Sequence, residues 1–200
     1  MNKMRVAVFA SGSGTNLQAI IDAQIETVQI AVVFTNKSDA YALERAKEHN
    51  IPILVIDHKE YDSREEYDAD IIKALEPYNP DLIVLAGYMR ILSPVFVRAY
   101  KGKIINIHPA LLPSFPGINS GRQALQYGVK YTGVTVHFVD EGVDTGPIIL
   151  QSIVEIEDGD TEETLLQKIH IVEHQIYPKA LELVSSGKIE VQGRRVIKKS

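Results

Sequence analysis

Short apolar runs alternate with segments of helical periodicity along the first half of the chain. The apolar runs are rich in Val and Ile and nearly continuous in hydrophobicity, which is typical of strands buried on both faces of a sheet. They predict strands at residues 5–10, 29–34, 53–56, 82–86 and 103–107. The segments between them predict helices at 16–23, 38–49, 62–77 and 93–99. This alternation predicts an α/β fold, with a doubly wound, mostly parallel sheet and helices on both faces.

The second half has a different pattern. Apolar runs at 133–139 and 147–156 predict two strands joined by an acidic, glycine-bearing loop, and residues 161–186 predict one long helix. Glu162 and Glu163 in its first turn suit the helix dipole. Two short runs around Gln192-Gly193 predict a small C-terminal hairpin.

Composition narrows the function classes. A chain of 200 residues predicts a single domain over 1–200. It has no cysteine, which excludes a disulfide framework, a cysteine zinc site and a cysteine nucleophile. Its net charge is −5, with no basic stripe, so no nucleic-acid partner is expected. The first apolar run is too short for a signal peptide, and no run is long enough to span a membrane, so we expect a cytoplasmic protein without a membrane partner.

A glycine-rich segment, Ser11-Gly12-Ser13-Gly14-Thr15-Asn16, follows the first predicted strand and leads into a helix. In doubly wound sheets, ligands bind at the carboxyl ends of the strands. Small residues allow close approach to a phosphate, and the helix N-terminus points N–H groups at it. The segment lacks the Lys-Ser/Thr ending of a P-loop and the third glycine of a dinucleotide site. The alternative is a plain tight turn, with the helix capped by Thr15 or Asn16.

Polar side chains also gather after the fifth predicted strand. Period-two alternation puts Asn106 and His108 on one face, and Pro109 ends the strand. Two adjacent donors of this kind suit an oxygen that gains negative charge during a reaction. Asp144, in the later acidic loop, would favour the imidazolium if it reached His108. The alternatives are a structural histidine and an ordinary turn carboxylate.

Other chemistry has weaker support. A Gly-x-Ser-x-Gly elbow is absent from the sequence, so a covalent acyl-enzyme is not expected. His170 and His174 have the i, i+4 spacing of metal ligands, but they lack the Glu of a zincin motif and a third ligand. We therefore expect no metal.

Seven motifs in order resemble those of the phosphoribosylglycinamide formyltransferases, a family of folate-dependent formyltransferases in purine synthesis. The resemblance extends from about residue 6 to 184 and includes Leu-Ala-Gly-Tyr-Met-Arg-Ile-Leu-Ser at 85–93 and Asn-Ile-His-Pro-Ala-Leu-Leu-Pro at 106–113. The others lie at 11–16, 62–65, 136–140, 144–149 and 173–178. The resemblance implies a Rossmann-like formyltransferase fold, with the nucleotide phosphate bound by the N-terminal half and the folate site completed by the C-terminal half.

The resemblance also implies roles for individual residues. Gly14, Thr15 and Asn16 would hold the phosphate of glycinamide ribonucleotide, and Glu173 would accept hydrogen bonds from its ribose. Asn106, His108 and Asp144 would be catalytic. The implied co-substrate is 10-formyltetrahydrofolate, the partners are small molecules, and the assembly is a monomer or homodimer. The implied folate contacts are Arg64, Met89, Arg90, Ile91, Leu92, Asn106 and Val143.

One departure and three alternatives accompany this resemblance. Relatives carry histidine near positions 119 and 121, where this chain has Asn119 and Gly121. The first alternative is formyltetrahydrofolate hydrolysis by the same three residues, although such relatives carry an extra regulatory domain before the core. The second is a formyltransferase acting on initiator tRNA, which has an added C-terminal domain and a basic surface. The third is a non-catalytic phosphate-binding module, which gives Asn106, His108 and Asp144 no role.

Overall fold

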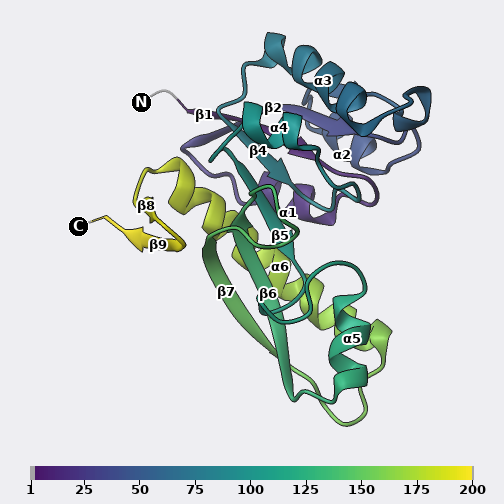
Figure 1. Ribbon diagram of the computed structural model, residues 1–200, viewed down its shortest axis with the longest axis vertical. Coiled ribbons are helices and arrows are strands. Elements are labelled where there is room, and N and C mark those ends of the chain that lie inside the picture. The colour runs from purple at the N-terminus through teal and green to yellow at the C-terminus, as the bar shows by residue number, and fades with distance from the viewer. Residues whose placement is uncertain (1–2, 200) are drawn as a thin grey trace.

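A computed structural model describes residues 3–199 (Figure 1). Nine strands within this range form one sheet. The strands are β1 (Met4–Phe9), β2 (Val28–Thr35), β3 (Ile53–Val55), β4 (Leu82–Leu85), β5 (Ile104–His108), β6 (Tyr131–Phe138), β7 (Ile148–Glu155), β8 (Ile189–Gln192) and β9 (Arg195–Lys198). Their order across the sheet is β3-β2-β1-β4-β5-β6-β7-β9-β8.

The first five strands are parallel to one another. Strand β6 then runs antiparallel to β5, and β7 antiparallel to β6. The chain winds from β1 to β2 and β3 on one side, then returns to place β4 and β5 on the other. This reversal makes a switch point between β1 and β4, where a crevice forms in folds of this kind. The predicted doubly wound, mostly parallel sheet is confirmed, and β8 and β9 form the predicted hairpin.

Helices cover both faces of the sheet, as predicted. On one face α1, α2, α5 and α6 contribute to a core with Val8, Val84 and Ile105, and on the other α3 and α4 pack on Phe9, Phe34 and Ile83. None of the helices within residues 3–199 is long and apolar enough to cross a membrane. The helices are α1 (Thr15–Asp22), α2 (Ala42–Glu48), α3 (Arg64–Leu75), α4 (Pro94–Ala99), α5 (Ser120–Tyr127) and α6 (Glu162–Ser185), with 3-10 turns η1 (His58–Glu60) and η2 (Glu76–Tyr78).

The helices differ from the sequence prediction in three places. Helix α5 was not among the predicted helices, because its eight residues include few apolar ones; its N-cap, Asn119, has a left-handed backbone (φ 57°). Helix α2 begins four residues later than predicted. Helix α3 ends at Leu75, and the chain continues as η2 around Pro77, which has no N–H to donate to a further helical turn.

Candidate active site

Loops from the carboxyl ends of β1, β4 and β5 meet at one edge of the sheet. The Ser11 N–H after β1 donates to the Gly87 carbonyl after β4, at 3.0 Å. The segment after β5 meets the loop between β6 and β7, because Gly117 N–H donates to Asp144 at 2.8 Å. The candidate residues therefore lie at the edge where ligands bind in doubly wound sheets.

The glycine loop is rigidly held against α2. Gly14 is the N-cap of α1 and has a left-handed backbone (φ 70°), and a Cβ there would lie 2.8 Å from the Ala42 Cβ. The Ala42 N–H donates to the Gly12 carbonyl at 3.1 Å, and Arg45 Nε donates to the Ser13 carbonyl at 2.8 Å. No side chain caps α1, so the expected alternative of a Thr15 or Asn16 cap is wrong. The first N–H groups of α1 remain available to an anion.

Asn16 and Glu173 form a buried pair beside this loop. The Asn16 Nδ2 lies 3.0 Å from Glu173 Oε2, and the two residues are 8% and 6% exposed. Burial raises the pKa of Glu173, while the hydrogen bond from Asn16 and the charges of His170 and His108 oppose that rise. Asn16 Oδ1 is buried without a partner among the described residues. Its free acceptor fits a ligand that donates hydrogen bonds.

Tyr177 fixes the position of Glu173 relative to the sheet. One helical turn after Glu173, its hydroxyl donates to the Leu85 carbonyl at 2.8 Å and approaches the Ile105 carbonyl at 3.3 Å. Full burial raises the pKa of Tyr177 well above its usual value. The hydroxyl therefore stays protonated and ties α6 to the ends of β4 and β5. No pattern in the sequence identified this residue.

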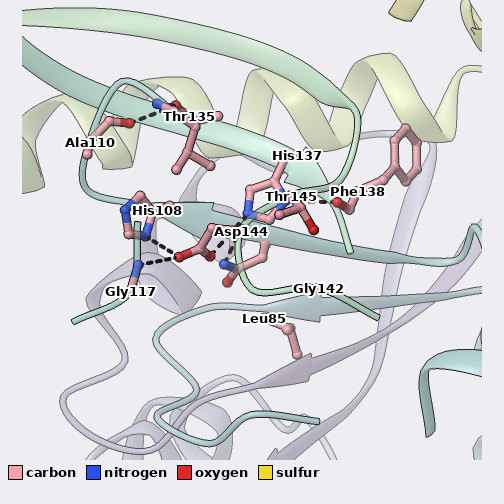
Figure 2. A network of polar contacts seen from close by, with 12 residues as sticks. Leu85, His108, Ala110, Gly117, Thr135, His137, Phe138, Gly142, Asp144 and Thr145 are labelled. Carbon is pink, nitrogen blue, oxygen red and sulfur yellow. Dashed lines mark hydrogen bonds and ion pairs between the residues drawn. The ribbon is translucent and has the colours of Figure 1, made fainter. Parts of the chain in front are cut away.

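His108 and Asp144 point toward one another at the end of β5 (Figure 2). His108 Nδ1 lies 3.4 Å from Asp144 Oδ2, and its Nε2 lies 2.9 Å from the Phe115 carbonyl oxygen. Both partners are acceptors, so only the doubly protonated ring can donate to both of them. Asp144 has a left-handed backbone (φ 54°), a conformation that clusters at functional sites in folded proteins.

His137 joins Asn106 to this pair; it lies in the motif at 136–140, but no role was predicted for it. It pairs with Asn106 across β5 and β6. Its Nε2 lies 3.3 Å from Asn106 Nδ2 and 3.7 Å from Asp144 Oδ1, while its Nδ1 lies 2.8 Å from the Phe138 carbonyl oxygen. Burial lowers the pKa of His137. A neutral ring that donates from Nδ1 to Phe138 and accepts from Asn106 at Nε2 satisfies these two hydrogen bonds, and it leaves Asn106 one further N–H.

Thr135, two residues before His137 on β6, holds the turn after β5. The Thr135 hydroxyl donates to the Ala110 carbonyl at 2.7 Å and accepts from the Leu112 N–H at 3.1 Å. Figure 2 shows Thr135 above His108, bonded to this turn. The Leu112–Pro113 peptide bond within it is cis. Thr135 and His137 lie on the same face of β6. This spacing is visible in the sequence, but it predicts a role at the site only once the pairing of β6 with β5 is known.

The residues expected to contact folate lie on two loops, one helix and, for Asn106, strand β5. Met89 and Ile91, on the loop after β4, are 80% and 61% exposed, whereas Leu92 is buried. The Arg90 guanidinium lies 5.2 Å from the centre of the Tyr67 ring. Val143 is half-exposed on the loop between β6 and β7, and Arg64 is exposed in the first turn of α3.

Asp68 connects α3 to the loop after β4. Its carboxylate accepts from the Ser93 N–H at 2.6 Å, at the start of α4. Burial raises the pKa of Asp68, against the lowering effects of that hydrogen bond and of the nearby Arg90 and Arg64 charges. The charges of Arg90 and Arg64 therefore both lie near this buried carboxylate.

His170 and His174, which have the spacing of metal ligands, are not part of a ligand set within the described residues. His170 and His174 stack with their ring centres 6.4 Å apart. No group of three or more ligating side chains occurs within residues 3–199. An open groove of about 710 Å³ runs from Thr15 along α1 and α6, lined by Arg45 and His174 among others. Its lining includes none of His108, His137 and Asp144, which lie at the ends of β5 and β6 and on the loop between β6 and β7.

Known proteins resemble this chain over almost its whole length. A profile described as formyl transferase matches residues 4–181. A phosphoribosylglycinamide formyltransferase from Escherichia coli (strain K12) is 44% identical over 191 residues, which cover 94% of this chain and 90% of that protein. A crystal structure of glycinamide ribonucleotide transformylase 1 from Symbiobacterium toebii has a TM-score of 0.96 and 47% identity, covering 99% of this chain and 95% of that one.

A longer relative shares the same region. The trifunctional purine biosynthetic protein adenosine-3 of Drosophila pseudoobscura pseudoobscura is 51% identical over 190 residues, which are 92% of this chain. The chain spans only 14% of the length of that relative. The similarity therefore concerns one part of that protein.

Proposed function

Because the chain belongs to the formyl transferase family, we propose that it transfers a formyl group from 10-formyltetrahydrofolate to the amine of glycinamide ribonucleotide, a step of purine biosynthesis. The observation that carries the proposal is the cluster of His108, Asp144, His137 and Asn106 beside the glycine loop. It unites a charged donor, an amide donor and an anion-binding helix end at one edge of the sheet.

The reaction is a direct transfer through a tetrahedral intermediate. The glycyl amine nitrogen attacks the formyl carbon, and the carbonyl π electrons move to the formyl oxygen. Collapse of this intermediate breaks the bond to folate N10. The amine loses one proton and N10 gains one, which a bound water relays beside Asp144. Holding both substrates together is worth at most about 7–11 kcal/mol of the barrier.

Asn106 and His108 stabilise the oxyanion. Asn106 keeps one N–H free after its contact with His137, at 3.3 Å. His108 Nε2 meets the Phe115 carbonyl oxygen at 2.9 Å, so the formyl oxygen replaces that carbonyl as its acceptor. Asp144 holds the charged ring from the other side. Removing one donor of this kind costs roughly 100- to 1000-fold in rate.

The ribonucleotide lies along the N-terminus of α1. Gly14, Thr15 and Asn16 bind its phosphate with N–H groups that α1 leaves free, and Glu173 accepts from the ribose hydroxyls. The location of Glu173, 3.0 Å from Asn16, supports this assignment. A local site of this kind suits an acidic protein, whose overall field repels anions.

The folate lies against the loop after β4. The exposed side chains of Met89 and Ile91 offer apolar surface to its ring system, and Arg90 and Arg64 offer positive charge. Leu92 supports this loop from the core, while Asn106 and Val143 approach from the other side. We further propose that residues 1–200 act as one catalytic domain, as a monomer or homodimer in the cytoplasm, without a metal.

A formyl-transfer assay tests the proposal. Purified protein is incubated with 10-formyltetrahydrofolate, with and without glycinamide ribonucleotide, and both formylated nucleotide and tetrahydrofolate are measured. Transfer predicts that tetrahydrofolate appears only when the ribonucleotide is present, in equal amount to the formylated product. Release of formate without the ribonucleotide would instead show a hydrolase, and binding without either product would show a non-catalytic module.

A further inference from the structure

A buried serine joins the two substrate loops at the switch point of the sheet. Ser11 follows β1 at the start of the glycine loop and is 3% exposed. Its Oγ accepts a hydrogen bond from the Met89 N–H at 2.9 Å. Its own N–H donates to the Gly87 carbonyl at 3.0 Å. A single residue therefore contacts the loop after β4 through both its main chain and its side chain.

The direction of these hydrogen bonds is fixed by chemistry. A main-chain N–H can only donate, so the Ser11 oxygen accepts from Met89 and its hydrogen must go elsewhere. The Oδ1 of Asn36 lies 2.6 Å from that oxygen and accepts it. Asn36, directly after β2, is 2% exposed, and its Nδ2 lies 3.4 Å from His58 Nδ1. The result is a polar chain across the ends of β4, β1 and β2, of a kind in which each bond strengthens the next.

The loop after β4 needs such an anchor. Gly87 has a left-handed backbone (φ 81°), and the Tyr88 ring packs against the core, with its centre 5.4 Å from that of the Phe9 ring. The next side chains, Met89 and Ile91, are mostly exposed, so they contribute little packing beyond Tyr88. At its far end Leu92 is buried and the Ser93 N–H is bound by Asp68. Between Tyr88 and Leu92, the hydrogen bond from the Met89 N–H to Ser11 ties the exposed stretch to the sheet.

We propose that Ser11 is a positioning residue for the formyl donor: its hydroxyl, oriented by Asn36, sets the height of the 88–92 loop against the glycine loop. This inference rests on the proposed function, because that function assigns the donor to the 88–92 loop. Ser11 does not itself contact the reacting atoms. Its effect is on the affinity for the folate, while the chemistry of the bound substrates is unchanged.

Ser11→Ala tests the proposal. The Met89 N–H loses its acceptor, and we expect the KM for 10-formyltetrahydrofolate and the Kd for tetrahydrofolate to rise about 5- to 10-fold. The KM for glycinamide ribonucleotide and kcat should change by less than about twofold. Thr132→Val is the matched control, since it removes another buried hydroxyl, one with no partner among residues 3–199. It should leave both KM values unchanged.

A double-variant cycle separates positioning from general destabilisation. Asn36→Ala frees the Ser11 hydroxyl from its fixed direction and should raise the folate KM by less than Ser11→Ala does. If the polar chain acts as one unit, the double variant should be no worse than Ser11→Ala alone. Additive effects, equal losses for both substrates, or an unchanged folate KM in Ser11→Ala would each overturn the proposal.

The outcome can be told apart from failure of the proposed function. Calorimetric titration with tetrahydrofolate reports on the loop even in a protein that does not transfer formyl groups. If the unaltered protein binds tetrahydrofolate but transfers nothing, the proposed function fails and the role of Ser11 is still measured. If it transfers formyl groups and Ser11→Ala binds tetrahydrofolate normally, only the positioning role fails.

Discussion

Asp144 is the carboxylate of the cluster formed by His108, His137, Asn106 and Asp144. It contacts His108 and His137 and accepts from the Gly117 N–H. Asp144→Asn keeps the shape of the side chain and removes the negative charge 3.4 Å from His108 Nδ1. We expect kcat to fall about 100- to 1000-fold, because the oxyanion loses its charged donor, with little change in either KM. Steady-state kinetics with both substrates measures this.

A neighbouring carboxylate provides the control. Glu141 lies in the same loop but forms an exposed ion pair with Arg98 at 2.8 Å. Glu141→Gln should keep kcat within about twofold, since exposed pairs contribute little. Near-normal turnover in Asp144→Asn would exclude Asp144 from catalysis.

Glu173 is assigned to ribose binding, and burying its carboxylate lowers the stability of the folded protein. Burial raises its pKa above 4.5, so the folded protein holds this proton more tightly than the unfolded chain. That preference favours folding at low pH and is lost as pH rises from 4.5 through the folded-state pKa. Glu173→Gln removes the titration. We therefore expect its free energy of unfolding, relative to the unaltered protein, to increase with pH above about 4.5.

The same variant should bind the ribonucleotide less well. Losing a charged acceptor of two ribose hydroxyls should raise the KM for glycinamide ribonucleotide about 10-fold or more. Urea unfolding between pH 4 and 8, alongside kinetics, measures both effects. Glu182→Gln, an exposed change on the same helix, is the control and should change neither. A pH-independent stability difference would show that Glu173 does not carry this cost.

The residues that the sequence could predict are those near the carboxyl end of a strand. Asn106 and His108 share a face of one strand, and their period-two spacing is visible without a structure. His137 could not be predicted in the same way, because it reaches Asn106 only through the antiparallel register of β6 on β5. The contacts of Ser11 and Tyr177, both of which lie in named motifs, could not be predicted for a similar reason, since their partners lie 78 and 92 residues away.

At the scale of elements, the glycine loop is shaped by its contact with α2. Gly14→Ala places a methyl group against Ala42 in a left-handed backbone. We expect a loss of about 1–3 kcal/mol in the free energy of unfolding and a rise of at least about 10-fold in the KM for the ribonucleotide. Gly12→Ala is the matched control, because a Cβ at Gly12 meets nothing within 4 Å. Its unfolding free energy should change by less than about 0.5 kcal/mol.

Unfolding by urea and titration with glycinamide ribonucleotide measure the two effects of Gly14→Ala separately. Equal stabilities for the two alanine variants would show that the contact with α2 does not shape this loop.

The predicted bounds of strands and helices agree with the structure where hydrophobic periodicity is strong. Strands β1, β4 and β5 begin and end within two residues of their predicted positions, because each is an apolar run ended by Gly, Ser or Pro. Helix α5 was missed because its short sequence has only Ala124 and Leu125 as apolar residues of its inner turns. It begins after a left-handed Asn119, and no pattern distinguishes that start from a turn.

At the scale of the whole molecule, the order of the strands in the sheet determines which residues meet at the site. The switch between β1 and β4 brings the loops after both strands together, and the antiparallel β6 and β7 add His137 and Asp144 at the end of β5. Alternation of strands and helices predicts the parallel part. It does not predict that β6 reverses beside β5, which depends on pairing between segments that lie far apart in the sequence.

The net charge of −5 determines how the association rate of the proposed anionic substrates should depend on salt. Proteins that steer anions with a positive field lose association rate steeply as salt shortens the Debye length, from roughly 30 Å at 0.01 M to 10 Å at 0.1 M. Under the proposed function, this acidic protein binds its anionic substrates through one helix end and a few arginines. Raising potassium chloride from 0.01 to 0.1 M should therefore leave kcat/KM for glycinamide ribonucleotide within about twofold, or raise it.

Sulfate at equal ionic strength should act differently from chloride. It resembles a phosphate and competes for the N–H groups at the N-terminus of α1, so it should raise the KM for the ribonucleotide without changing that for 10-formyltetrahydrofolate. Gly14→Ala, which disrupts this helix end, should reduce the sulfate effect. A steep fall in kcat/KM with chloride alone would show long-range steering and contradict binding by a local device.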